Sequence, residues 1–77
     1  MDATEIKQII ITETAQALGL KEDQITDETL VFANLDPLAG LRLKSSIMRK
    51  AGLGWFLDSM HGLTVESLTK ILCNEPT

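Results

Sequence analysis

The segment Leu35-Asp36-Pro37-Leu38-Ala39-Gly40-Leu41 marks the start of a helix in the middle of the chain. Pro37 suits the first helical position, where a backbone N–H would have no helical acceptor, and Asp36 is placed to cap the opening amides. Apolar residues then recur at steps of three and four, at Leu38, Leu41, Leu43, Ile47, Met48 and Ala51. With Gly52 as a stop signal, we predict a helix over residues 37–51.

The chain before this segment predicts an amphipathic helix over residues 3–18 and then a long loop. One face of that helix combines Ile6, Ile9, Ile10, Ala17 and Leu18, and the other face combines Glu5, Lys7, Gln8, Glu13 and Gln16. Gly19 is placed to end the helix in the left-handed conformation. Residues 20–35 are polar and irregular, so we expect a loop that five apolar residues hold against the core: Leu20, Ile25, Leu30, Phe32 and Leu35.

The chain after Gly52 predicts two further helices. A short one spans residues 55–60, and Thr64 is suited to cap a last one over residues 64–73. The apolar positions of the last helix are Val65, Leu68, Ile71 and Leu72. The predicted fold class is therefore all-α: a small bundle of three main helices plus one short helix, with a long loop between the first two, in a single domain over residues 1–77.

Composition narrows the function classes. A length of 77 residues with 44% apolar residues suits one small folded domain. The sequence contains one cysteine, Cys73, and one histidine, His61, so we expect no metal site and no base–nucleophile pair of an enzyme. We expect Cys73 to be a small core residue. The N-terminus has no basic segment before an apolar run, and no stretch approaches roughly 18 apolar residues. We expect a cytoplasmic monomer that does not bind a membrane.

The formal net charge of −4 is unevenly distributed along the chain. Residues 1–36 carry eight acids and two cations, whereas residues 37–77 carry five cations and three acids. Four of the seven cations lie between residues 42 and 50. Because the domain is acidic overall and nearly free of aromatic residues for base stacking, we expect no nucleic-acid partner.

Four motifs, in order, give the chain a family resemblance. They are Ala17-Leu18-Gly19-Leu20, then Gln24-Ile25-Thr26-Asp27-Glu28-Thr29-Leu30, then Leu35-Asp36-Pro37-Leu38, and finally Leu63-Thr64-Val65-Glu66-Ser67-Leu68. Their order and spacing span nearly all of the chain, which resembles the acyl/peptidyl carrier domains of fatty-acid, polyketide and nonribosomal peptide assembly lines. The resemblance implies a small helical bundle whose second helix is the main recognition surface for partner enzymes.

The chain departs from this family at the attachment site. In carriers the motif reads Leu-Asp-Ser-Leu, and the serine takes 4'-phosphopantetheine from coenzyme A at a helix N-terminus that favours the phosphate. Here Pro37 aligns with that serine and has no side-chain oxygen, and the glycine expected before the motif is also absent. We therefore expect no cofactor at position 37.

Another serine is the alternative attachment point. Asp58-Ser59-Met60 copies the Asp-Ser-Leu/Met pattern, although only eighteen residues follow Ser59, too few for the remaining helices of the family fold. Ser45 and Ser46 fall inside the predicted second helix, where free amides are lacking. Under this alternative, 4'-phosphopantetheine is the cofactor and Ser59 carries it.

The cations of the predicted second helix, Arg42, Lys44, Arg49 and Lys50, have two interpretations. They form a solvated face that keeps the domain soluble, or they belong to a contact surface. In free-standing carriers this helix is usually acidic and meets basic patches, so a basic version favours acidic partners. Our candidate partner-binding residues are Leu38, Leu41, Arg42, Ser45 and Arg49.

Three functions stay open at this level. The first is a non-enzymatic, carrier-like module of a fatty-acid, polyketide or nonribosomal peptide pathway that lost loading at Pro37 and works by docking pathway enzymes or domains on its second helix. The second is a working carrier primed on Ser59 that shuttles thioester intermediates. The third is a free regulatory or scaffold protein that kept only the helical bundle.

Overall fold

The computed structural model describes residues 2–33, 35–53 and 62–73, and these residues form an all-helical domain. The elements are α1 (Ala3–Leu18), the 3-10 helix η1 (Glu22–Gln24), α2 (Pro37–Lys50) and α3 (Val65–Cys73). The predicted fold class is confirmed, and the three main helices begin and end within one residue of their predicted bounds. The short helix predicted over residues 55–60 lies outside the described residues.

Capping residues explain several of these bounds. The Asp2 carboxylate accepts a hydrogen bond from the Glu5 N–H at 2.9 Å, and Gly19 ends α1 with a φ of 70°. At the start of α3 the Thr64 hydroxyl accepts a hydrogen bond from the Ser67 N–H at 3.1 Å. Thr64 is therefore the cap of the last helix rather than its first residue.

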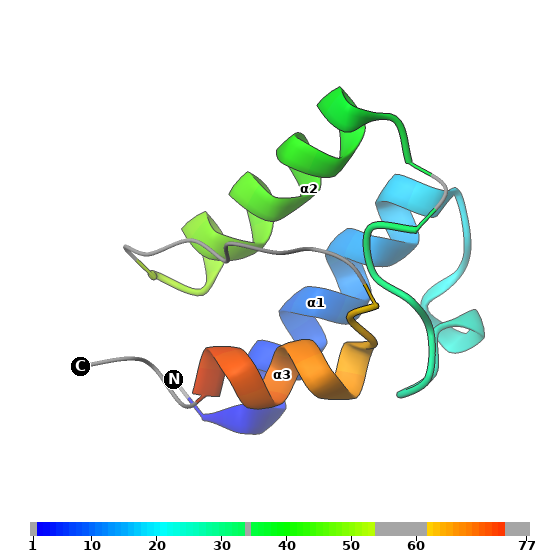
Figure 1. Ribbon diagram of the computed structural model, residues 1–77. Helices are drawn as coiled ribbons and strands as arrows, with labels where there is room; N and C mark the ends of the chain where they lie inside the picture. The colour runs from blue at the N-terminus through cyan, green and yellow to red at the C-terminus, as the bar shows by residue number, and fades with distance from the viewer. Residues whose placement is uncertain (1, 34, 54–61, 74–77) are drawn as a thin grey trace.

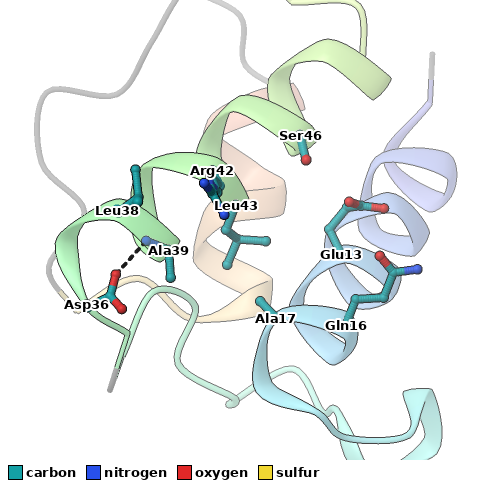
Figure 2. A pocket seen from close by; sticks show the side chains of 9 residues that line it. All are labelled: Glu13, Gln16, Ala17, Asp36, Leu38, Ala39, Arg42, Leu43 and Ser46. Carbon is teal, nitrogen blue, oxygen red and sulfur yellow. Dashed lines mark hydrogen bonds between the residues drawn. The ribbon is translucent and has the colours of Figure 1, made fainter.

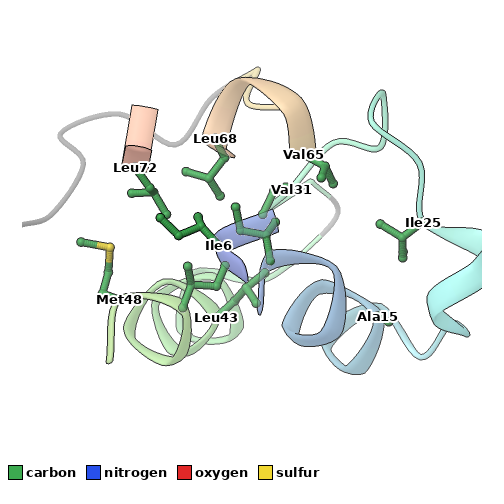
Figure 3. Close-up of a cluster of buried hydrophobic side chains, with 11 residues drawn as sticks. Ile6, Ala15, Ile25, Val31, Leu43, Met48, Val65, Leu68 and Leu72 are labelled. Atoms are coloured by element: carbon green, nitrogen blue, oxygen red, sulfur yellow. The ribbon is translucent and has the colours of Figure 1, made fainter. Parts of the chain in front are cut away.

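In Figure 1, α1 runs between α2 and α3, and α1 packs against both of them. The core lies where these three helices and the loop meet, and Figure 3 shows most of its side chains. Its buried members are Ile6, Ile10, Ala15, Ile25, Val31, Leu43, Ile47, Met48, Val65, Leu68 and Leu72. Each helix contributes residues to one shared core, so the bundle depends on all three.

The loop between α1 and α2 is held to the core by fewer residues than predicted. Ile25 is buried, and Phe32 and Leu35 are half-buried against the core. The prediction was wrong for Leu20 and Leu30, which are 43% and 48% exposed. The loop also contains the 3-10 helix η1, which the irregular sequence pattern did not indicate.

Backbone hydrogen bonds explain why the loop buries a different residue. The Val31 N–H donates to the Leu63 carbonyl at 2.8 Å, and the Val65 N–H donates to the Thr29 carbonyl at 3.0 Å. These two bonds fasten the loop to the segment that enters α3. Val31 is directed inward by this arrangement and is only 2% exposed.

The buried face of α1 also differs from the prediction. Glu13, which was assigned to the polar face, is 6% exposed, whereas Ala17, assigned to the apolar face, is exposed. The reason is that α2 approaches α1 on the side of Glu13, where Lys50 Nζ lies 2.6 Å from Glu13 Oε2. On α3, Cys73 is exposed, so the expectation that it is a small core residue was wrong, and the apolar Ile71 is 36% exposed.

Candidate functional site

The N-terminus of α2 forms an exposed corner of the domain. Pro37 is the first residue of the helix, and the Asp36 carboxylate accepts a hydrogen bond from the Ala39 N–H at 2.7 Å (Figure 2). The Gly40 N–H donates to the Asp36 carbonyl at 2.9 Å. The predicted helix start, with Asp36 as cap and Pro37 in the first position, is therefore confirmed.

This corner does not fit an attached phosphopantetheine. The group is held through a phosphodiester to a side-chain hydroxyl, and Pro37 supplies neither a hydroxyl nor a backbone N–H. Ser45 and Ser46 are interior residues of α2, well past the opening amides of the helix. Ser59, the alternative attachment residue, lies outside the described residues.

The five predicted partner-binding residues share one exposed face of α2. Their spacing of three, four, seven and eleven residues from Leu38 places them on one side of a helix with 3.6 residues per turn. All five are exposed, and Leu38 and Leu41 are 57% and 50% exposed. We call Leu38, Leu41, Arg42, Ser45 and Arg49 the α2 face. The opposite side of α2, including Leu43 and Ile47, is buried against the rest of the domain.

The α2 face carries positive charge. The sequence of α2 contains four cations and no acid. Lys50 forms its ion pair with Glu13. In the part of the chain that the structure describes, Arg42 and Arg49 make no ion pair with any acid. Two exposed leucines and two uncompensated guanidinium groups therefore lie on the same side of one helix.

A groove between α1 and α2 adjoins the α2 face (Figure 2). Its volume is about 320 Å³, and we call it the α1–α2 groove. It is lined by three residues of α1, by Asp36 before α2 and by five residues of α2: Glu13, Gln16, Ala17, Asp36, Leu38, Ala39, Arg42, Leu43 and Ser46. Leu38 and Arg42 belong to both surfaces, so a molecule that contacts the α2 face also reaches the groove.

The sequence prediction missed this groove because it placed Glu13 on the outer side of α1. A signal for burial was present: Glu13 follows Ile6 by seven residues and Ile10 by three, which is the spacing of one helix face. A carboxylate on an apolar face needs a partner, and Lys50 supplies it. Nothing in the local sequence names that partner, because the two residues are 37 positions apart.

Two negative findings bear on other kinds of function. Within residues 2–33, 35–53 and 62–73, no three His, Cys, Asp or Glu side chains are grouped in a way that would hold a metal ion. Over the same residues, every helix is too short or too polar to cross a bilayer. Cys73 is exposed and His61 lies outside the described residues.

Comparisons with known proteins add no relative. No protein-family model, no curated protein and no solved structure matches the chain. The resemblance to carrier domains therefore rests on the four sequence motifs.

Proposed function

We propose that this protein is a carrier-like docking module of a pathway that builds acyl or peptidyl intermediates, and that it carries no prosthetic group at position 37. The observation that supports this most is Pro37 itself. It stands at the exposed first position of α2, directly after the capping Asp36, where carriers place their attachment serine. The helix start and its capping aspartate are thus present without the hydroxyl and without the glycine that carriers have before the motif.

Docking on α2 is the function that such a domain retains. The α2 face is exposed over three turns of a long helix, while the buried side of the same helix is anchored in the core. A helix held in this way presents a preformed surface, so little of its backbone has to become ordered when a partner binds, and the entropic cost of binding is lower. The protein positions an enzyme or domain of the pathway by this contact and performs no chemistry itself.

A working carrier primed on Ser59 is the competing proposal, and a free scaffold protein is a third. The working carrier is separated from the docking module by whether the chain accepts a phosphopantetheine group; the free scaffold protein, like the docking module, accepts none. The carrier requires a covalent arm, whereas the docking module excludes it.

The test is incubation of the purified protein with coenzyme A, Mg²⁺ and a broad-specificity phosphopantetheinyl transferase, followed by intact-protein mass spectrometry. A carrier domain with a Leu-Asp-Ser-Leu motif serves as the positive control. We expect no added mass on the wild-type chain. An added phosphopantetheine mass would overturn the docking module, and its loss in Ser59→Ala would assign the arm to Ser59.

A further inference from the structure

The two leucines of the α2 face have no cover within the described part of the domain. Leu38 and Leu41 are 57% and 50% exposed and lie one turn apart at the N-terminal end of α2. Both leucines are therefore available for contact with another molecule. They define the apolar half of the α2 face.

The two arginines define a cationic half. Arg42 and Arg49 follow the leucines along the same side of α2, two turns apart. Neither forms an ion pair with a described acid, and α2 itself contains none. A partner with carboxylates at this spacing gains attraction and bidentate hydrogen bonds, while a partner with lysines is repelled. Charge complementarity therefore selects an acidic partner.

The α1–α2 groove adds a place for one apolar side chain. Its apolar lining comes from Leu38, Ala39 and Leu43 of α2 and from Ala17 of α1, and the uncharged polar side chains of Gln16 and Ser46 also border it (Figure 2). At about 320 Å³ it is large enough to receive an aliphatic or aromatic side chain.

Two carboxylates also lie at the groove, and both have partners. Glu13 pairs with Lys50, and Asp36 accepts the Ala39 N–H. These anions disfavour a partner carboxylate within the groove beside them, so the acids of the partner belong on the exposed α2 face, at Arg42, which borders the groove, and at Arg49 beyond it. An apolar side chain inside and acids along one flank is the pattern of an amphipathic helix.

We propose that the partner of this protein contributes an acidic amphipathic helix, which lies along the α2 face with one apolar side chain in the α1–α2 groove. The proposal rests on the proposed function, because it names the class of partner for the same surface. A second copy of this chain and a membrane are the other occupants that the experiment below distinguishes.

The probes are two synthetic helical peptides with the same leucines at positions i, i+3, i+4 and i+7 and with either glutamate or lysine at the flanking positions. Binding is measured by fluorescence anisotropy at low and at physiological salt. We expect the glutamate peptide to bind at least about tenfold more tightly than the lysine peptide, with an affinity that falls as salt rises. Equal affinities would overturn the proposal.

Variants locate the contact on the protein. Arg42→Glu is expected to lower the affinity of the protein for the glutamate peptide by about tenfold or more. Lys21→Glu makes an equal change of charge at an exposed loop residue and is expected to change that affinity by less than about twofold. Ala17→Phe fills the groove from an exposed position and is expected to weaken binding, whereas Ala17→Ser retains it. If folded Ala17→Phe still binds the peptide, the groove is not part of the contact. If Arg42→Glu and Lys21→Glu weaken binding equally, the peptide responds only to the net charge of the protein.

Two further measurements separate the other occupants and the two proposals. Sedimentation velocity over a range of protein concentrations tests whether the protein self-associates and whether Arg42→Glu prevents this. Such self-association would show that the α2 face binds a second copy of the chain and would overturn the acidic helix. Tighter binding to vesicles of anionic lipid than to the glutamate peptide would show that a membrane is the partner and would overturn the acidic helix. Phosphopantetheine transfer to the wild-type chain overturns the proposed function, whereas failed peptide binding with no such transfer overturns the acidic helix alone.

Discussion

Lys50 and Glu13 join the C-terminal end of α2 to the middle of α1, with Lys50 Nζ 2.6 Å from Glu13 Oε2. The Glu13 side chain is only 7% exposed, whereas the Lys50 side chain is 48% exposed. The carboxylate thus depends on the ammonium group for its charge compensation, while the ammonium group also has water. Because Glu13 lines the α1–α2 groove, the same pair helps to fix the position of α2 beside that groove.

Removal of Lys50 is therefore expected to lower the free energy of unfolding more than removal of a lysine from an exposed ion pair. Lys50→Met leaves the Glu13 carboxylate buried without its cation and should lower the free energy of unfolding by about 1–2 kcal/mol. Lys70→Met breaks the exposed pair with Glu66, 3.1 Å apart, and should cost less than about 0.5 kcal/mol. Urea denaturation compares the two variants, and equal losses would contradict the role given to Glu13.

Removal of the Thr14 hydroxyl is expected to stabilise the protein, unlike removal of Lys50. Thr14 is 1% exposed, and its Oγ1 has no hydrogen-bond partner among the described residues. Thr14→Val removes this unpaired group at nearly constant volume and should raise the free energy of unfolding by about 1 kcal/mol.

Thr69 is the matched control for Thr14. It is also buried, but its hydroxyl donates to the Val65 carbonyl at 2.7 Å. Thr69→Val should therefore lower the free energy of unfolding by about 0.5–1 kcal/mol. Thermal or urea unfolding that shows the same sign for Thr14→Val and Thr69→Val would contradict this assignment.

The cap of α2 is expected to support the corner that carries Pro37. Asp36→Ala removes the acceptor of the Ala39 N–H and should cost about 1 kcal/mol of stability. Asp36→Asn keeps a side-chain oxygen at the same place and should cost clearly less. Both free energies come from urea unfolding, and a loss in Asp36→Asn as large as in Asp36→Ala would show that the cap is not the source of the stability.

The pair of Lys7 and Asp27 predicts a loss of stability at alkaline pH. Lys7 Nζ donates to Asp27 Oδ1 at 2.7 Å, and this hydrogen bond is the main reason that the pKa of Lys7 is raised above its ordinary value of 10.5; the charges of Asp27 and Glu66 add to the rise, and burial opposes it. The folded state holds the proton more tightly than the unfolded state. The contribution is thus complete below pH 10.5 and is lost as the pH rises through the raised pKa.

Lys7→Met tests this prediction, because it removes the titrating group. The urea midpoint of the wild-type chain should fall more between about pH 9 and about pH 11.5 than the midpoint of Lys7→Met. A larger fall in the variant would reverse the sign, and equal falls would mean that the ion pair contributes nothing in solution.

Helix bounds could be predicted because their signals are local. Asp2, Gly19, Asp36 and Thr64 each act on groups within a few residues of themselves, so the sequence contains both the cap and what it caps. The exposed position of Pro37 at the start of α2 follows from the same signals.

Burial was harder to predict, because it depends on neighbours distant in sequence. Periodicity alone assigned Leu38 and Leu41 to the same apolar pattern as Leu43 and Ile47, yet only the side of α2 that faces the domain is buried. The α2 face was found because charge and family resemblance pointed to it, whereas the groove required the approach of α1 and α2.

Phe32 illustrates a feature with no local signal. Its φ is 73°, a left-handed conformation that costs energy for a residue with a bulky side chain. The aromatic ring packs against the core, and the preceding residue Val31 is tied to Leu63 by its backbone N–H. The packing of its ring and the hydrogen bond of the preceding residue therefore hold Phe32 in a conformation that its own preferences disfavour.

The most direct test of the central claim restores the missing hydroxyl. Pro37→Ser is made together with Ser59→Ala, and both this variant and Ser59→Ala alone are incubated with coenzyme A, Mg²⁺ and the transferase. Circular dichroism confirms that each variant is folded. If the frame of a carrier site surrounds position 37, the double variant gains one phosphopantetheine mass, located at position 37 by peptide mapping, and Ser59→Ala alone gains none. A folded double variant that stays unmodified, under conditions in which the control carrier is fully loaded, would contradict the claim.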